Sequence, residues 1–145
     1  MKVHGSYLLP GSREQVWELL TDPARLVKLL PGAEELVPEG PDRYKVSVKF
    51  GIAAITGKYA GSVELTEKLQ PASLRMRVAG KGIPGFMNGE GKLELHAKGN
   101  QTEVLYDGEA QVGGVIASVG QRMIESAAKR IIHQFFESAA AQLKS

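Results

Sequence analysis

The spacing that most resembles a chemical motif is Gly80-Lys81-Gly82-Ile83-Pro84-Gly85, which matches the pattern GxGxxG. A dinucleotide-binding loop needs this pattern between a strand and a helix, whose N-terminus binds the phosphates. Here an alternating strand pattern follows the glycines and Pro84 lies among them, so we expect no dinucleotide site. The glycines instead predict a sharp bend between two strands. We interpret Ile83, Phe86 and Met87 as the apolar lip of a cavity mouth.

The other reactive side chains lack the partners that catalysis or metal binding requires. His4, His96 and His133 show no metal-ligand spacing, and the chain has no cysteine for thiolate ligands or disulfides. Ser118 has neither a GxSxG context nor an obvious base. The carboxylates are spread along polar strand faces, without a pair placed for acid–base catalysis. We therefore expect no catalytic residue, no metal and no cofactor.

Composition indicates an ordinary globular protein of one domain, residues 1–145. Hydrophobic residues make up 43% and charged residues 23% of the chain, enough apolar material for a substantial core. The 18 basic and 16 acidic side chains are too balanced to predict nucleic-acid binding. The N-terminus lacks the apolar core of a signal peptide, and no apolar run is long enough to span a membrane. We expect a cytoplasmic protein with at most peripheral membrane contact.

The elements that must position any site begin with a strand and two short helices. Residues 2–10 alternate loosely and predict the first strand. Ser12, with glutamine three residues later, forms a capping box that begins a helix over 13–20. Asp22 is a second cap, followed by proline at the first helical position, and predicts a helix over 23–30.

Period-two alternation then predicts about six further strands. The cleanest pattern has Tyr44, Val46, Val48 and Phe50 alternating with polar residues. The predicted strands lie within 34–38, 43–50, 52–69, 74–78, 87–96 and 104–112. Short turns join them, so the sheet should be a mostly antiparallel meander with one apolar face.

The C-terminal segment, Gly113 to Leu143, predicts the helix that covers this face. It contains no proline, and its apolar or small residues recur at helical spacing. A helix of about 29 residues would be roughly 43 Å long and could cross the whole sheet. The predicted fold class is α+β: a curved antiparallel sheet of about seven strands wrapped round a long C-terminal helix, with two short helices after the first strand.

Three local motifs carry a resemblance to a known family. They are Val16-Trp17-x-x-Leu20-x-Asp22-Pro23 continuing to Leu30-Pro31-Gly32, Ile55-x-Gly57-x-Tyr59-x-Gly61 with Leu65-x-Glu67, and Gly113-Gly114-x-Ile116-Ala117-x-Val119-Gly120-x-Arg122 with Gln134-Phe135-Phe136. Together they resemble the carbon monoxide dehydrogenase G-subunit family, which belongs to the SRPBCC, or START-like helix-grip, superfamily. The resemblance covers nearly the whole chain.

The resemblance implies a helix-grip fold, an apolar ligand and a partner enzyme. Members of this family accompany molybdenum hydroxylases of the CO dehydrogenase type and are linked to recruitment of that enzyme to the membrane. Some members carry a C-terminal extension that ends in a membrane anchor. This sequence ends at Ser145, directly after the expected helix, so we expect no anchor of that kind here.

Two features predict a cavity rather than a filled core. A sheet bent round one helix encloses more volume than two short helices fill. The start of the long helix offers small residues, such as Gly120, where a filled core would have leucine. The candidate wall residues are Leu26, Leu29, Leu30, Tyr44, Val46, Phe50, Tyr59, Met76, Ile83, Phe86, Met87, Tyr106, Ile116, Val119, Gly120 and Met123. Such walls suit an amphiphilic ligand with a polar head.

Three functions remain open at this point. The first is a non-enzymatic carrier of an apolar small molecule, such as a respiratory quinone or a lipid, that assists a CO dehydrogenase-like molybdenum hydroxylase. The second is an assembly or membrane-recruitment factor that acts through its surface; Arg75 and Arg77 are candidates for its interface, although solvated edge charges are the simpler interpretation. The third is a polyketide cyclase-like enzyme with Tyr44, Tyr59 or Tyr106 as the acid.

Overall fold

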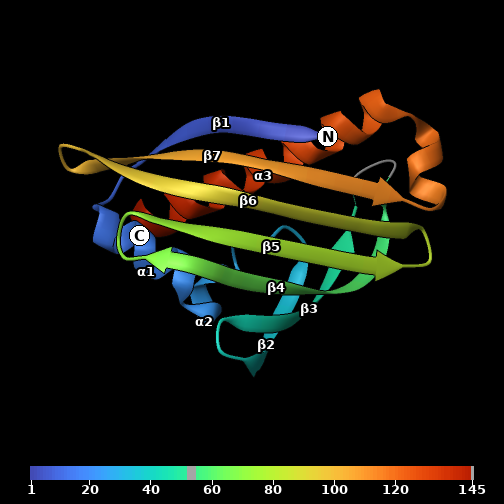
Figure 1. The fold of residues 1–145 in the computed structure, drawn as a ribbon, viewed down its shortest axis with the longest axis horizontal. Coiled ribbons are helices and arrows are strands. Elements are labelled where there is room, and N and C mark those ends of the chain that lie inside the picture. The colour runs from blue at the N-terminus through green and yellow to red at the C-terminus, as the bar shows by residue number, and fades with distance from the viewer. Residues whose placement is uncertain (52–54, 145) are drawn as a thin grey trace.

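The computed structural model describes residues 1–51 and 55–144 (Figure 1). In chain order the elements are β1 (Lys2–Leu9), α1 (Arg13–Thr21), α2 (Pro23–Leu26), β2 (Ala33–Gly40), β3 (Arg43–Phe50), β4 (Gly57–Leu69), β5 (Ser73–Gly82), β6 (Gly85–Lys98), β7 (Gln101–Gly113), the 3₁₀ helix η2 (Val115–Val119) and α3 (Gln121–Lys144). The predicted strand over 52–69 appears as β4 from Gly57 onward, and residues 52–54 of that prediction lie outside the described residues.

The strands of this part of the chain form one seven-stranded sheet in the order β1-β7-β6-β5-β4-β3-β2. All neighbouring strands are antiparallel, and β1 pairs with β7 rather than with the next strand in sequence. The sheet curves, and α3 lies across its concave face (Figure 1). The predicted meander and the α+β helix-grip architecture are therefore confirmed.

The first helix begins where its cap predicts. The Ser12 hydroxyl accepts a hydrogen bond from the Gln15 backbone N–H at 3.2 Å, and the Gln15 side-chain oxygen accepts one from the Ser12 N–H at 2.8 Å. This reciprocal pair satisfies two of the backbone donors that a helix start leaves free. Four apolar residues of α1 are buried: Val16, Trp17, Leu19 and Leu20. The helix thus covers one end of the sheet.

The second helix is shorter than predicted. Asp22 caps it as expected, since its carboxylate accepts a hydrogen bond from the Ala24 N–H at 3.1 Å. The helix ends at Leu26 instead of continuing through residue 30. Beyond that point the N–H groups of Lys28 and Leu29 bond to carbonyls three residues back, which tightens the chain into successive turns. These turns bring Leu29 into the core.

The long C-terminal helix also begins later than predicted. Strand β7 continues through Gly113, the short helix η2 follows, and α3 begins only at Gln121. Gly114 has φ 82° and Gly120 has φ 99°, a left-handed conformation that a continuous α-helix does not contain. The 24 residues of α3 span about 36 Å, still enough to cross the sheet.

Buried side chains form two clusters separated along the sheet. The larger one joins the sheet to α1, α2 and the C-terminal half of α3, and Tyr7 stacks on Phe136 there with ring centroids 4.4 Å apart. The smaller one contains Ile55, Tyr59, Ile116 and Ala127, at the end where η2 lies. This division leaves room between α3 and the middle of the sheet.

Candidate functional site

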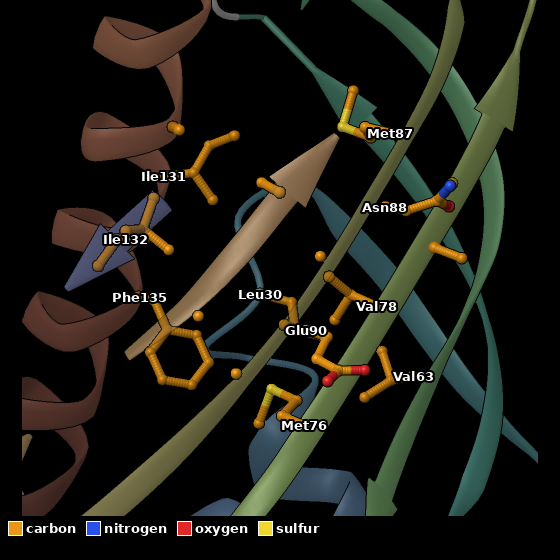
Figure 2. Close-up of a pocket in the computed structure, with 18 of the residues that line it drawn as sticks. Leu30, Val63, Met76, Val78, Met87, Asn88, Glu90, Ile131, Ile132 and Phe135 are labelled. Atoms are coloured by element: carbon orange, nitrogen blue, oxygen red, sulfur yellow. The ribbon is translucent and has the colours of Figure 1, made fainter. Parts of the chain in front are cut away.

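A cavity of about 330 Å³ lies between the concave face of the sheet and α3. The helix contributes Ile124, Ala127, Ala128, Ile131, Ile132, Phe135 and Phe136 to its wall. Figure 2 shows Ile131, Ile132 and Phe135 facing Leu30, Met76 and Val78 across this space. The side chains that meet there are almost entirely apolar, so the cavity favours an apolar occupant.

Glycines of the sheet, rather than glycines of the helix, leave this space open. Gly80 continues the inward-facing parity of Met76 and Val78 on β5, and Gly89 and Gly91 continue that of Met87 on β6. Gly61 on β4 and Gly108 on β7 also lie in the cavity wall, but a β-carbon there would collide with the backbone carbonyls of Ala79 and Glu90, so these two glycines are required by the close approach of neighbouring strands. At Gly80 an added β-carbon would make only ordinary contacts, so the absence of a side chain there leaves space under α3.

The sequence placed the origin of the cavity at the small residues that begin the long helix, such as Gly120. Gly120 and the neighbouring small residues lie at the end of β7 and around η2, outside the wall of this cavity. They mark the place where the chain turns from strand to helix. The cavity instead depends on small residues in the curved middle of the sheet.

The structure brings one group of the predicted wall residues together around the cavity. They are Leu30, Val46, Phe50, Tyr59, Met76, Met87 and Tyr106. All but Leu30 come from strands, where alternation alone assigns a face to each residue. Their role in binding a ligand stays a prediction.

Three predicted wall residues lie in packed regions instead. Leu26, the last residue of α2, and Leu29, in the turns that follow it, are fully buried in the larger core cluster with residues of α1 and the sheet. Tyr44 is 8% exposed and lies two residues before Val46 on β3, beyond the edge of the cavity. These three side chains pack the fold and do not border the open space.

A second group lies at the end of the molecule beyond the cavity. Its members are Ile83, Phe86, Ile116, Val119, Gly120 and Met123, and none of them lines the cavity wall. Ile116 is buried in the smaller cluster, whereas Ile83 is 99% exposed at the turn between β5 and β6. Of the predicted lip, only Met87 borders the cavity. The break in the helix at Gly120 separates Val119 from the face that α3 presents to the sheet.

Several wall residues were missed by the sequence interpretation. They include Met1, Val3, Val48, Ile55, Val63, Val78, Leu93, Ala110 and Val112, together with the α3 residues named above. Strand alternation marks Val63, Val78 and Val112 as inward-facing, and helical spacing relates Ile124, Ala128 and Ile131. These signals were available, but they do not distinguish a cavity wall from a packed core.

Arg75 and Arg77 on β5 do not border the cavity, whereas Glu90 of the neighbouring strand β6 does (Figure 2). Glu90 forms ion pairs with Arg75 at 3.4 Å and with Arg77 at 3.1 Å. Arg75 also pairs with Glu67 at 2.8 Å. Strand β5 is central in the sheet, so the expectation that these arginines are edge charges is wrong. They belong to a paired network across the outer face.

Two tyrosines provide the phenol groups of the wall. The Tyr59 hydroxyl donates a hydrogen bond to the Ile55 carbonyl at 3.0 Å. Burial raises the pKa of Tyr59, and burial followed by the neighbouring Tyr7 raises the pKa of Tyr106. Desolvation disfavours the phenolate, so both groups remain protonated at neutral pH and are poorer acids than a free tyrosine.

These shifts predict a loss of stability in alkali. Because the folded-state pKa values are raised, the unfolded chain releases these protons first, and the free energy of unfolding should fall as the pH rises through about 10. The double variant Tyr59→Phe, Tyr106→Phe should lose less of its own stability over that range. Urea unfolding of both proteins at a series of pH values measures the difference. If the free energy of unfolding fell equally steeply with pH in both proteins, Tyr59 and Tyr106 would not be the groups that cause the loss of stability.

The described residues show neither a cluster of metal-ligating side chains nor the strand–loop–helix order of a dinucleotide-binding loop. No group of three or more histidines and carboxylates is close enough to hold a metal ion in this part of the chain. The glycines from Gly80 to Gly85 lie at the hairpin between β5 and β6 and lead into strand β6 rather than into a helix, as a dinucleotide-binding loop would require. The described helices also include none that is long and apolar enough to cross a membrane.

Comparison with solved structures supports the fold. A conserved protein from Geobacillus kaustophilus is 37% identical, with a TM-score of 0.95 over 99% of this chain and 95% of that one. A protein from Chromobacterium violaceum is 16% identical, with a TM-score of 0.74 over 99% and 97% of the two chains. The Zhui aromatase/cyclase from Streptomyces sp. R1128 is 16% identical, with a TM-score of 0.67 over 99% and 93%. The latter two similarities show the fold alone.

Comparison at the level of sequence families identifies the chain. No curated protein matches it at a significant level. The model of the CoxG family, described as the G subunit of carbon monoxide dehydrogenase, matches residues 5–144. The match includes every described strand and helix apart from the start of β1, and it agrees with the fold and with the motifs in the sequence. The protein therefore belongs to the carbon monoxide dehydrogenase CoxG family.

Proposed function

We propose that this protein is a non-enzymatic carrier that binds an apolar small molecule in the cavity under α3. The observation that supports this function is the cavity itself, about 330 Å³ of space with apolar walls from Met76, Val78, Ile131 and Phe135. An ordinary protein core is close-packed and would not keep an empty volume of this size, because the side chains around a void lose packing contacts. The absence of a side chain at Gly80 leaves part of this space open.

The chemistry of the walls favours a ligand with a long apolar part. The Tyr59 hydroxyl already donates to the Ile55 carbonyl, so it does not readily donate to a ligand head. The volume lies near the lower end of small-molecule sites, roughly 300–1,000 Å³, and would hold part of a prenyl or acyl tail. Burial at about 25 cal/mol per Å² can provide micromolar affinity. We propose a respiratory quinone as the first candidate and a lipid as the second.

The proposed partner is a molybdenum hydroxylase of the CO dehydrogenase type. The description of the family refers to carbon monoxide dehydrogenase, an oxidoreductase, and we propose that its electrons pass to the respiratory chain. A carrier that shields the tail of a quinone would connect the enzyme to that chain. We propose that the carrier presents its ligand to the enzyme rather than transforming it.

The cyclase-like alternative has less support. The similarity to an aromatase/cyclase shows a common fold at 16% identity. A tyrosine acid would need its pKa lowered toward neutrality, whereas burial raises the pKa values of Tyr59 and Tyr106. Tyr44 does not border the cavity.

Extraction of the purified protein tests the carrier function. We expect native mass spectrometry to show one bound small molecule per chain, and organic extraction to release a prenylquinone or a lipid. Addition of that compound to the stripped protein should restore the mass of the complex. A protein that is empty when purified and that takes up neither added quinones nor lipids would contradict the proposal. That outcome would favour a recruitment factor that acts through its surface.

A further inference from the structure

Tyr106 brings to the cavity wall a hydroxyl group that forms no hydrogen bond with the residues the structure describes. A second wall tyrosine, Tyr59, donates its hydrogen to the Ile55 carbonyl at 3.0 Å, and Tyr7, outside the wall, contacts His133. Each buried side-chain oxygen or nitrogen in this part of the chain has a partner, so the unpartnered Tyr106 hydroxyl must reach open space. It is therefore free to bind a ligand.

The Tyr106 hydroxyl lies between β1 and α3. Gly5 on β1 is directly opposite Tyr106 on β7, and a β-carbon at Gly5 would lie 2.6 Å from the Tyr106 Oη atom. The ring therefore extends over the bare backbone of Gly5, toward the edge strand of the sheet. Phe136 of α3 stacks on this ring with centroids 5.6 Å apart. The two contacts together fix the position of the hydroxyl.

Other polar groups gather on this side of the cavity. The ring of Tyr7 stacks on that of Tyr106 with centroids 6.2 Å apart, and its hydroxyl lies 3.1 Å from His133 Nδ1. The Nε2 atom of His133 is 2.8 Å from a carboxylate oxygen of Glu137. This chain of polar groups leads from the side of Tyr106 to the outer surface of α3. It makes this side of the cavity suitable for the polar end of a ligand.

The other polar residues of the wall are less suited to donate a hydrogen bond to a ligand. Glu90 only accepts hydrogen bonds when ionised, and it already pairs with two arginines of β5. Asn88 and Gln111 are opposite each other on β6 and β7 and are exposed, so water competes for their amide groups. Tyr106 is half-buried, and burial, followed by the neighbouring Tyr7, raises its pKa. It therefore stays protonated and remains a donor at neutral pH.

We propose that Tyr106 donates a hydrogen bond to a carbonyl oxygen at the polar end of the ligand. That end would lie between β1 and α3, and the apolar tail would follow the sheet toward Met87. Met87 is six residues from Leu93, the residue opposite Tyr106, so the tail has about 20 Å of strand to follow. This inference rests on the proposed carrier function. It adds the orientation of the ligand and the group that distinguishes a carbonyl compound from a hydrocarbon.

Equilibrium dialysis of the stripped full chain with two matched probes tests the proposal. The probes 2-pentyl-1,4-naphthoquinone and 2-pentylnaphthalene share a ring system and a tail, but only the first has carbonyl oxygens. We expect Tyr106→Phe to weaken binding of the quinone about tenfold and to change that of the hydrocarbon by less than about twofold, because one hydrogen bond is lost. Tyr59→Phe is the matched control. Its hydroxyl is bound to the protein, so this variant should change both affinities by the same factor.

The outcomes distinguish this inference from the carrier function. If the wild-type protein binds both probes and Tyr106→Phe alters their affinities equally or not at all, the role of Tyr106 is overturned and the carrier function stands. Methyl laurate and dodecane form the corresponding pair for the ester carbonyl of a lipid. An effect of Tyr106→Phe on the ester alone would support the hydrogen bond and assign the carbonyl to a lipid. A wild-type protein that binds none of the four probes would overturn both proposals.

Gly5→Ala tests the position of the hydroxyl without removing it. The added β-carbon would displace the Tyr106 ring, so the variant should lose its preference for the quinone. Gly51→Ala is the control, because no atom of the described residues lies within 4 Å of its added β-carbon. A preference that survives in folded Gly5→Ala would overturn the placement of the ligand.

Infrared spectra of the bound quinone provide a second measurement. A hydrogen bond weakens the C=O bond, so the carbonyl stretching frequency should be lower in the wild-type complex than in the Tyr106→Phe complex. Tyr59→Phe should keep the wild-type frequency, since its hydroxyl donates to Ile55. The same frequency in the wild-type and Tyr106→Phe complexes would overturn the proposed hydrogen bond.

Discussion

Replacing Gly80 with leucine is expected to abolish most ligand binding while the protein stays folded. A β-carbon at Gly80 would lie 3.6 Å from the Tyr59 Cβ and 3.7 Å from the Met87 Cγ, which are ordinary contact distances. The rest of the side chain would extend into the cavity and displace about four carbons of ligand. At about 0.8 kcal/mol per buried methylene, this costs roughly 3 kcal/mol, or more than a hundredfold in affinity.

Isothermal titration calorimetry with a short-chain prenylquinone measures this loss of affinity. Ala60→Leu is the matched control, because Ala60 is exposed on the outer parity of β4 and pairs with Lys81, the residue next to Gly80. The control should bind as the unchanged protein does, and both variants should keep the same far-ultraviolet circular dichroism. Wild-type affinity in folded Gly80→Leu would place the ligand elsewhere.

The sequence analysis named Gly120 as a wall residue and so suggests Gly120→Leu as a way to fill the cavity. That substitution would not show whether the ligand binds in the cavity. Gly120 has φ 99°, lies outside the wall and has no neighbouring atom near its added β-carbon. Leucine there would strain the backbone at the start of α3 without filling the space under the helix. The informative glycine is in the sheet.

Leu29→Ala is expected to lower mainly the stability of the protein and Leu30→Ala to change mainly its ligand affinity, although the two residues are adjacent. Leu29 is fully buried in the core, and its truncation should lower the free energy of unfolding by about 2–5 kcal/mol. Leu30 borders the cavity, so its truncation removes fewer packing contacts and enlarges the site. It should cost less stability and change ligand affinity.

Chemical denaturation and ligand titration on both variants separate these roles. Leu29→Ala should bind with nearly unchanged affinity at a temperature where it remains folded. Leu30→Ala should shift affinity and favour a bulkier ligand. If Leu29→Ala were the variant with altered binding and Leu30→Ala the less stable one, the assignment of core and wall would be reversed.

Local hydrogen bonding made the early part of the fold predictable. The Ser12 capping box and the Asp22 cap involve residues only two or three apart, so the sequence contains both partners of each interaction. Strand alternation likewise identifies inward-facing residues such as Met76 and Tyr106, because successive strand residues always point to opposite faces. Both kinds of prediction rest on short-range geometry.

The helix boundaries were less predictable, because residues compatible with a helix can adopt other structures. Residues 115–119 have helical composition, yet they form η2 between two glycines with positive φ. The hydrogen bond from Ile116 to Pro84 connects this segment to a hairpin some thirty residues earlier. That contact is tertiary, and helix propensity does not report it.

The meander, the covering helix, the two caps and the family motifs could all be predicted from the amino-acid sequence, because each depends on periodicity or on neighbours in the chain. Which inward-facing residues border a cavity became clear from the packing of the folded protein. Leu29 and Leu30 have the same side chain, but Leu29 is buried in the core and Leu30 borders the cavity. They differ because α1 and α2 pack against one end of the sheet only. Gly80 borders the cavity, and an added β-carbon there would make only ordinary contacts, a property that depends on the packing of distant segments and that no local pattern encodes.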